Sequence, residues 1–586
     1  MSTLESVVGS EYLADWLPRE ARPTNSFVHF HQKFWGKPEE EGLGVHEDGD
    51  GSKLYEMGAE DFMVVDDSTD ESEPEDGDIG SRCYALDVER NYPGTIWVRN
   101  EYIRVFEFAE SFYSLAVSSR PDAPAPAPCL IVTGQPGIGK SVWQWYALRV
   151  CCGKRRPVIL YSGGECWLFV DEGVFMRPPD FGPDLYQSVI WTLVGSVDTG
   201  PDGLPVCFKG HATRHFIIYT TPLTPSNWAK IDQFMTRKIV MMNPWTKAEI
   251  YKAASYFPIP TATIDQRIHE FGFIPRRCFQ LQEVDLDDDR RCMVVALDAF
   301  TLDDVDGLAF REYLSLDSPW DLLFLLRRKD AGLLSTAVSI EPISSFVECK
   351  FFTWMRSQRR RDLVHLFNRF VCRSATQKLA GCVFKAYCHV VFSLMIEFDP
   401  LPMARDADEL TATKEGSGHE IFYNKKGPQQ TLEGLGPNSQ TLVIKPRRSV
   451  NYCSASAACE LDIQEEIYYI PLKANQIGID SFILHDSILY LFQITVSTKP
   501  GIKDALLPFL KSLSGLPPQS NWHVIFVKPP FNVLECPVPK STELQSLKLF
   551  SAEVKVTSGE PEIEWIPRRP RTMVDDVFMH KVSQVR

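Results

Sequence analysis

The residues of this chain that are best suited to chemistry form a glycine-rich loop. In order, they are Gly134, Gln135, Pro136, Gly137, Ile138, Gly139, Lys140 and Ser141. Glycines let successive backbone N–H groups turn toward phosphate oxygens, the Lys140 ammonium reaches the β- and γ-phosphates, and the Ser141 hydroxyl ligates Mg²⁺. The loop therefore predicts a nucleoside triphosphate site, with ATP and Mg²⁺ as its cofactors.

A second group of candidate residues lies near the carboxyl terminus. Asp480 begins an apolar segment, and Gln493 and Thr495 end the next one. These positions resemble the site of the restriction-endonuclease superfamily, in which an acid at the start of one strand and an acid two residues before a lysine on the following strand bind the divalent metal that activates water for phosphodiester attack. Asp480 fits the first position and is the expected metal ligand. Gln493 and Thr495 replace the second acid and the lysine, although a Gln carbonyl oxygen can still bind a hard cation.

The elements that must position the loop are a strand before it and a helix after it. Residues 129–132 are apolar, and residues 142–150 are amphipathic. A helix that begins near Lys140 adds its positive amino-terminal end to the anion site. Further strands are predicted at 156–161, 167–175, 188–194 and 215–221. Strands that alternate with helices predict an α/β fold with an open parallel sheet, which binds ligands at the carboxyl ends of its strands.

Two segments compete to supply the acid that holds Mg²⁺ and orients the attacking water. One apolar run ends in Asp171 and Glu172, early after the loop; another, at a better distance, ends in Gly195. Thr221 ends the last predicted strand and offers a hydroxyl to the γ-phosphate. Arg276 could stabilise the charge that develops during phosphoryl transfer, or could be a surface residue at a helix cap.

The carboxyl-terminal pattern also predicts a fold. A helix at 379–398 precedes strands at 467–470, 480–485 and 488–496, a helix at 502–513 and a strand at 523–527. This is the α-β-β-β-α-β order of a restriction-endonuclease-like core. Lys499 or Lys503 could supply the ammonium that Thr495 lacks.

Together the motifs resemble the fungal crinkler and retrotransposon-hot-spot-like proteins. The resemblance covers about residues 85–530 and adds Asn-Pro-Trp-Thr at 243–246 and Phe-Gly-Phe-Ile-Pro-Arg at 271–276 to the two sites above. It implies a P-loop ATPase of the AAA or signal-transduction (STAND) type, joined to a restriction-endonuclease-like domain in which Gln is common at the position of Gln493. Two acids that are usual in the family are replaced here by Gly195 and Lys385.

The predicted fold class is thus α/β, with a P-loop NTPase parallel sheet, a helical connector and a carboxyl-terminal restriction-endonuclease-like domain. Six segments are expected: an amino-terminal extension with an acidic linker (1–80), a helical lead-in with a Pro-rich linker (81–128), the P-loop core (129–244), a helical lid or connector (245–375), the nuclease-like domain with an insertion at about 400–460 (376–535), and a carboxyl-terminal extension (536–586).

Charge is unevenly distributed along the 586 residues. The net charge is −16, and fourteen acidic residues with one lysine lie between residues 47 and 78. Such a run predicts a disordered spacer, with an autoinhibitory or partner-binding tail as the alternative. Basic clusters at 356–361, 445–448 and 568–571 could contact the backbone of DNA or RNA, or could be solvated surface.

Composition also bears on the compartment. The fifteen cysteines lack zinc-site spacing, which predicts reduced thiols in an intracellular protein of the nucleus or cytoplasm. We expect no signal peptide and no membrane segment, because Lys385, His389 and Glu397 interrupt the longest apolar stretch.

These patterns predict an ATP-binding, ATP-hydrolysing protein coupled to a metal-dependent, nuclease-like domain that binds nucleic acid. The alternative is a nucleotide-switched signalling or scaffold protein whose nuclease domain is catalytically degenerate. In either case a nucleotide-dependent homo-oligomer could form.

Overall fold

A computed structural model describes most of the chain between residues 3 and 558. The described residues are 3–16, 26–37, 43–44, 84–87, 95–118, 128–199, 203–208, 213–223, 228, 231, 235–255, 257–310, 320–329, 332–334, 337–405, 421–424, 441–452, 461–472, 478–530, 532–539 and 541–558. The acidic linker, the Pro-rich stretch at 121–127, the basic cluster at 568–571 and much of the expected insertion lie outside these ranges. The chain divides into two units, residues 1–351 with 369–380, and residues 352–368 with 381–586.

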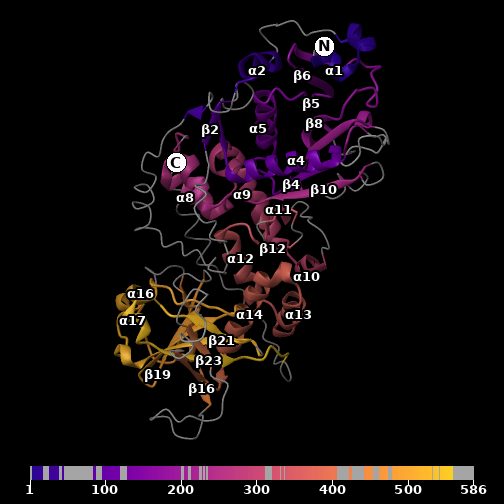
Figure 1. Cartoon of the computed structure of the whole chain (residues 1–586). Coiled ribbons are helices and arrows are strands. Elements are labelled where there is room, and N and C mark those ends of the chain that lie inside the picture. Colours follow the sequence, from indigo (N-terminus) through magenta and orange to yellow (C-terminus); the bar gives the residue numbers. More distant parts are fainter. Residues whose placement is uncertain are drawn as a thin grey trace, which may run out of the picture. The chain divides into compact units, whose positions relative to one another are not determined.

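A seven-stranded sheet lies at the centre of the first unit (Figure 1). Its strands are β4 (Cys129–Gly134), β5 (Val158–Ser162), β6 (Glu165–Val170), β7 (Gly173–Met176), β8 (Ile190–Gly195), β9 (His215–Thr220) and β10 (Arg237–Met242). The order across the sheet is β10-β4-β9-β8-β5-β6-β7, and the first five of these strands are parallel. The predicted α/β class, with parallel strands, is confirmed.

The predicted strand at 167–175 is instead a hairpin. Strands β6 and β7 pair antiparallel at the edge of the sheet, and the chain turns between them at Asp171 and Glu172. Gly173 has φ of 137°, a conformation that glycine adopts without the steric cost a side chain would add. The apolar run therefore folds back on itself, and the single-strand prediction was wrong.

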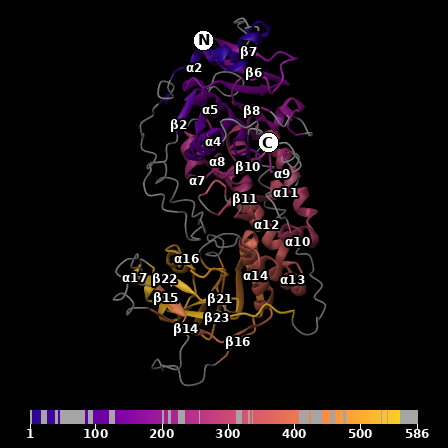
Figure 2. The ribbon, with the colours of Figure 1, turned by 45° about the vertical axis from the view of Figure 1, so that its right-hand side comes forward.

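Helices cover one face of this sheet and the amino terminus covers the other. Helices α4 (Asn100–Ser118) and α5 (Lys140–Gly153) lie beside the strands in Figures 1 and 2, and the ring of Phe112 on α4 packs on Phe216 of β9. On the opposite face, α1 (Thr3–Val8) and the following turn η1 (Ser10–Asp15) bring Leu4 and Trp16 into the buried core. The amino-terminal residues therefore belong to the first unit's core.

The remaining elements of the first unit include α2 (Ser26–Phe34) and a small antiparallel sheet. This sheet contains β1 (Leu43–Gly44), β2 (Tyr84–Asp87) and β3 (Thr95–Val98). After the large sheet come α7 (Lys247–Ala254), α8 (Thr261–Phe271), the π-helical turn η6 (Arg276–Gln280), α9 (Glu283–Asp298), α10 (Leu302–Phe310), α11 (Trp320–Leu323), and the hairpin β11 (Phe324–Arg328) with β12 (Val338–Pro342). Helices α12 (Ser345–Arg356), α13 (Arg360–Val371) and α14 (Gln377–Phe392) follow.

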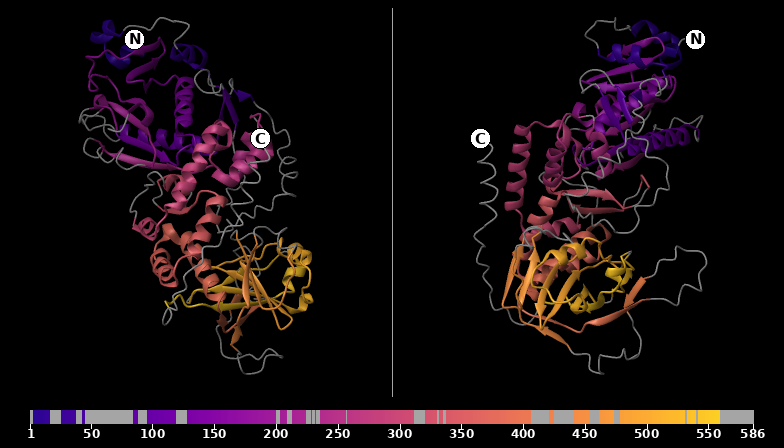
Figure 3. Two further views of the ribbon diagram at one scale, coloured as in Figure 1. Left: turned by 180° about the vertical axis from the view of Figure 1, so that it is seen from behind. Right: turned by 90° about the vertical axis from the view of Figure 1, so that its left-hand side faces the viewer.

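The second unit is built on a nine-stranded mixed sheet, whose orange and yellow strands are seen from two sides in Figure 3. In sheet order the strands are β17 (Arg448–Tyr452), β18 (Ile467–Pro471), β19 (Ser481–His485), β20 (Ile488–Ile494), β21 (Trp522–Lys528), β23 (Lys548–Glu553), β14 (Leu401–Arg405), β15 (Ile421–Asn424) and β22 (Glu535–Pro537). Strand β19 is antiparallel to both of its neighbours, β18 and β20, whereas β17 is parallel to β18 and β20 is parallel to β21. Strands β13 (Ile396–Phe398) and β16 (Leu442–Ile444) pair separately.

Two helices pack against this second sheet. Phe392 of α14 contacts Phe492 of β20, while Leu506 and Leu510 of α16 (Leu506–Ser512) share a core with Leu491 of the same strand. Because alternate residues of a strand face opposite sides, Leu491 and Phe492 place the two helices on opposite faces. None of the described helices is both long and apolar enough to cross a membrane.

Candidate functional site

The glycine-rich loop joins β4 to α5 at the carboxyl ends of the parallel strands. Gly137 and Gly139 both have positive φ, 82° and 98°. A Cβ atom at Gly137 would lie 2.8 Å from Ile274 Cγ2, so the chain after α8 passes directly over the loop. The loop thus requires glycine both for its backbone conformation and for this close packing.

Lys140 is half-buried at the start of α5. Its Nζ donates hydrogen bonds to the carbonyl oxygens of Gly134, at 2.8 Å, and Gln135, at 2.9 Å. Desolvation and, to a smaller extent, the Arg276 charge lower the pKa of Lys140 to about 7, against the opposing effect of the Asp321 carboxylate. The structure therefore brings Arg276 and Asp321 to the lysine of the loop.

Two further contacts hold these residues beside the loop. The backbone N–H of Arg276 donates to the Gly137 carbonyl, at 3.3 Å. The Gln135 side chain donates to the carbonyl oxygens of Asp321 and Phe324, at 2.7 and 3.0 Å. Asp321 was not predicted from the sequence, because it lies far along the chain and follows no recognisable motif.

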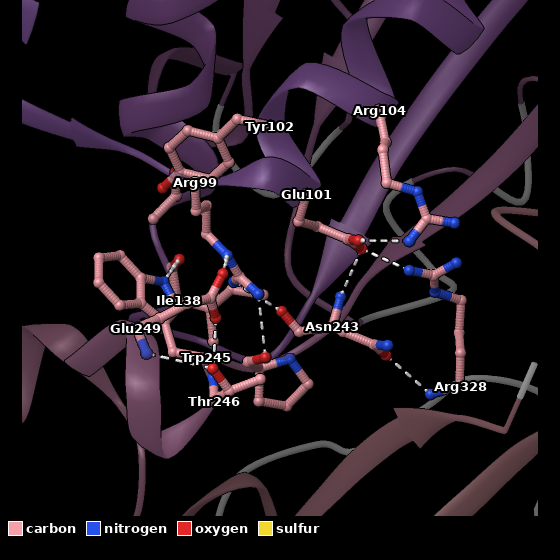
Figure 4. Close-up of polar contacts among 12 residues, drawn as sticks. Arg99, Glu101, Tyr102, Arg104, Ile138, Asn243, Trp245, Thr246, Glu249 and Arg328 are labelled. Carbon is pink, nitrogen blue, oxygen red and sulfur yellow. Dashed lines mark hydrogen bonds and ion pairs between the residues drawn. The ribbon is translucent and has the colours of Figure 1, made fainter. Parts of the chain in front are cut away.

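Two aromatic side chains, Tyr102 and Trp245, also hold the backbone of the loop (Figure 4). The Tyr102 hydroxyl donates to the Gly139 carbonyl at 2.9 Å, and the Trp245 indole N–H donates to the Ile138 carbonyl at 2.9 Å. Trp245 belongs to the Asn-Pro-Trp-Thr motif, which lies between β10 and α7. This motif therefore has a structural function, which is to hold the backbone of the loop.

A buried ionic network extends from these anchors (Figure 4). Glu101 accepts hydrogen bonds from the Arg328 guanidinium and from the backbone N–H of Asn243, and it lies 3.7 Å from Arg104. The side chains of Arg328 and Glu101 are 0% and 6% exposed. Arg99 makes a parallel set of bonds, to the Glu249 carboxylate and to the Asn243 carbonyl. Helix α4, the segment before α7 and strand β11 are thereby joined.

The structure places Asp171 and Glu172 away from the loop. Phe169 pairs with Val158, the first residue of β5. The β6–β7 turn therefore lies at the amino-terminal ends of the parallel strands, whereas the loop lies at their carboxyl ends. Asp171 accepts hydrogen bonds from Thr3 and Trp35, and Glu172 accepts one from the Leu4 N–H. These acids hold the amino-terminal helix, and the structure removes them from the candidate site. Gly195 ends β8 at the same end of the sheet as the loop, but glycine has no side chain that could bind Mg²⁺.

Thr220 ends β9, and Thr221 follows it. The Thr221 backbone N–H donates to the Val132 carbonyl of β4 at 3.0 Å, so Thr221 is adjacent to the strand that carries the loop. The Thr220 hydroxyl donates to Gln144 of α5 instead. Both side chains are buried.

In the second unit, Asp480 is bound to a lysine from α14. The Asp480 Oδ1 atom lies 3.2 Å from Lys385 Nζ, and its Oδ2 atom accepts a hydrogen bond from the Ile494 N–H at 2.6 Å. The side chains of Lys385 and Asp480 are 12% and 3% exposed. Lys385, which stands where the resemblance implied an acid, therefore supplies a positive charge directly to Asp480.

Gln493 and Thr495 are the neighbours of Ile494, whose N–H donates to Asp480. The Gln493 amide donates to the Gly501 carbonyl at 3.1 Å, and within the described part of the chain its buried Oε1 atom accepts no hydrogen bond. The Thr495 hydroxyl accepts from the Ser497 N–H at 2.9 Å and so stabilises the turn after β20. The Oε1 atom of Gln493 is therefore open to a ligand, and the Thr495 hydroxyl keeps one donor and one acceptor position.

No protein-family model matches the chain. Two proteins of Phytophthora infestans are similar to parts of it. Crinkler effector protein 15 is 26% identical over 178 residues, which are 30% of this chain and 28% of that protein. Crinkler effector protein 16 is 27% identical over 154 residues, which are 26% of this chain and 24% of that protein. The chain thus spans about a quarter of the length of these curated relatives. The similarity indicates a crinkler-like relation.

The residues around Asp480 do not fit a divalent metal as they lie. Among the described residues, no group of three or more His, Cys, Asp and Glu side chains could hold a metal ion. Both oxygens of Asp480 already face donors, one of them the Lys385 ammonium. The Nδ1 atom of the nearby His389 is not available as a ligand, because it is hydrogen-bonded to the Tyr468 hydroxyl at 2.9 Å.

Proposed function

We propose that the chain binds a nucleoside triphosphate at residues 134–141, as a P-loop NTPase of the AAA or STAND type. The observation that carries this proposal is the glycine-rich loop at the carboxyl end of β4, with Lys140 at the start of α5 bonded to the carbonyls of the loop. The parallel strand order, with β4 between β10 and β9, supports it. A helix amino terminus beside backbone N–H groups is a ready site for phosphate.

Within this proposal each residue has a separate part. Lys140 and Ser141 hold the terminal phosphates and Mg²⁺, as residues of these types do in such loops. Arg276, whose backbone N–H donates to the Gly137 carbonyl, neutralises the charge of the γ-phosphate. Asp321 replaces Asp171 and Glu172 as the candidate acid for hydrolysis, because its charge acts on Lys140.

The lowered pKa of Lys140 couples nucleotide binding to the uptake of a proton. At pH 8 a lysine of pKa about 7 is mostly neutral, and the triphosphate restores its charge. Binding of ATP should therefore take up roughly 0.9 proton at pH 8 and about 0.1 at pH 6. Titration calorimetry in two buffers of different ionisation enthalpy measures this uptake.

Asp321→Asn tests the assignment further. The aspartate charge favours the ammonium, so its removal should lower the pKa of Lys140 and increase proton uptake at pH 7. Lys154→Ala, on the exposed end of α5, should leave the uptake unchanged. An uptake that is the same at pH 6 and pH 8 would contradict the depressed pKa.

We further propose that the second unit is a restriction-endonuclease-like domain that binds nucleic acid without metal-dependent cleavage. The sequence of elements α14, β18, β19, β20, α16 and β21 supports the fold. The Lys385–Asp480 ion pair carries the proposal about cleavage, because an ammonium beside the carboxylate opposes a cation there. This favours the degenerate-nuclease alternative, in which nucleotide binding switches a protein that binds other macromolecules.

A metal-dependent nuclease is the second candidate. The observation in its favour is that Asp480 lies between Lys385 and the N–H of Ile494, and that the Oε1 atom of the adjacent residue Gln493 accepts no hydrogen bond from the described residues. Coupling of either activity to ATP rests only on the presence of both sites in one chain.

Cleavage assays separate the two candidates. Full-length protein with Mg²⁺ or Mn²⁺, with and without ATP, should leave linear DNA and RNA intact while it still retards them at low salt. Retardation should weaken as salt rises, because phosphate contacts release counterions. Asp480→Asn should change the affinity for nucleic acid less than about twofold.

Cleavage that requires the metal and is lost in Asp480→Asn would overturn the degenerate-nuclease proposal. Glu397→Gln, a matched change at an exposed carboxylate of the same unit, should leave every readout unchanged. Nucleic acid that is neither bound nor cut would leave a protein partner as the target of this domain.

A further inference from the structure

Two cysteine thiols meet on the face of the first sheet that the amino terminus covers. Cys166 lies on β6 and is buried, whereas Cys207 lies in the short turn η3 (Val206–Phe208) and is half-buried. Cys166 belongs to the buried hydrophobic cluster and Cys207 packs against that cluster, with the two thiols in hydrogen-bonding contact. The spacing of these cysteines in the sequence gave no indication of this pair.

Neighbouring aromatic residues fix the two segments against each other. Tyr161 pairs with Cys166 across β5 and β6, and the ring of Phe208 packs edge-on against the Tyr161 ring, with centroids 5.5 Å apart. The residue after Cys207 therefore contacts the residue opposite Cys166. Phe208 also packs at 5.0 Å against His215, which begins β9.

Arg177 supplies positive charge to this pair. Its backbone N–H donates to the Cys166 carbonyl at 2.9 Å, and its guanidinium bonds the Cys207 sulfur. The contact with Cys166 and the Arg177 charge lower the pKa of Cys207 below that of an ordinary thiol, whereas the pKa of Cys166 is raised. The other titratable groups nearby are neutral: burial raises the pKa of Tyr186 and lowers that of His215 to about 3.

We propose that Cys166 and Cys207 form a peroxide-sensitive pair that closes to an intramolecular disulfide. The Cys207 thiolate attacks one oxygen of hydrogen peroxide, the O–O bond breaks, and the hydroxide that leaves becomes water by combining with the proton that Cys207 had released to solvent. The resulting sulfenic acid is attacked by the Cys166 sulfur; an S–S bond forms, the S–O bond breaks, and the oxygen leaves as water with the Cys166 proton. One peroxide is reduced and two thiols are oxidised.

The arrangement assigns distinct roles to the two cysteines. Cys207 is half-buried and adjacent to a guanidinium, which are the conditions under which a thiol reacts as a thiolate. Cys166 lies deeper and acts as the resolving thiol. The neighbouring thiols Cys151 and Cys152 differ, because burial raises the pKa of each well above the ordinary value. The disulfide would tie the β6–β7 hairpin to the connection between β8 and β9.

Peptide mapping of the peroxide-treated full-length protein tests the proposal. Free thiols are blocked with N-ethylmaleimide, and the protein is digested without reductant. The expected product is a peptide containing Cys166 linked to one containing Cys207, which dithiothreitol separates. The bridge should also raise the thermal midpoint of the first unit by about 5 °C relative to the reduced protein.

Variants separate the roles of the two sulfurs. Cys166→Ser should leave a sulfenic acid at Cys207 that dimedone traps, and Arg177→Gln should slow oxidation of Cys207 several-fold. The double variant Cys292→Ser with Cys372→Ser, which removes two exposed thiols, should not change the link. The proposal is overturned if peroxide leaves Cys207 open to N-ethylmaleimide, or links it to another cysteine, in the wild-type protein. The peptide map of the wild-type protein tests the proposal even if a variant fails to fold.

Discussion

Lys140→Ala should weaken ATP binding by the full-length protein at least about a hundredfold, which corresponds to roughly 3 kcal/mol. The substitution removes the ammonium that faces the terminal phosphates, and charge-assisted hydrogen bonds to phosphate are among the strongest that proteins make. It also removes the bonds from Nζ to the carbonyls of Gly134 and Gln135, which hold the loop in its observed conformation. Titration with a fluorescent ATP analogue measures the loss.

Lys154→Ala is the matched control for this change. Lys154 follows the same helix, its side chain is 47% exposed, and it pairs with Glu110. An exposed pair contributes at most about 1 kcal/mol to stability, so this variant should bind ATP within about twofold of the wild type. If Lys140→Ala bound ATP as tightly as the wild type, residues 134–141 would not be a triphosphate site.

Glu101→Ala should have the largest effect on stability. It removes the carboxylate that the buried Arg328 guanidinium faces and that also accepts the Asn243 N–H. Removal of one partner from a buried ion pair costs about 3–5 kcal/mol, because the remaining charge loses its compensation. Chemical unfolding of the full-length protein, followed through tryptophan fluorescence, should show the first unit losing this amount.

Two further variants make the measurement specific. Glu107→Ala changes an exposed glutamate of the same helix and should alter the unfolding free energy by less than about 0.5 kcal/mol. Arg328→Met should cost less than Glu101→Ala, because Glu101 keeps Arg104 and the Asn243 N–H. Equal losses in Glu101→Ala and Glu107→Ala would show that the buried pair contributes little net stability.

Local patterns in the sequence predicted local structure well. The strand before the loop and the helix after it were predicted, because an apolar run, glycines and an amphipathic segment each act over a few residues. The hairpin at Asp171 was missed for a related reason. An apolar run with an acidic pair looks the same as one strand or as two, and the choice depends on Gly173 and on pairing with β5.

Contacts between distant segments could not be predicted in this way. Asp321 reaches Lys140, and Lys385 reaches Asp480, only because the fold brings separate elements together. No period or spacing in the sequence encodes either contact. The order of strands β18 to β21 was predicted, whereas β14, β15 and β22 at one edge of the same sheet were not, because their pairing partners are far apart in the chain.

The placement of α1 bears on how this protein can be divided for expression. Trp16 packs edge-on against Phe181, with ring centroids 5.1 Å apart, and Leu4 lies in the same buried core. A recombinant fragment that begins at residue 81 or 129 would leave this apolar surface open to water, and exposed patches of this kind promote aggregation. Soluble preparations of the first unit therefore require the amino-terminal helix, supplied either in the same polypeptide or as a separate peptide.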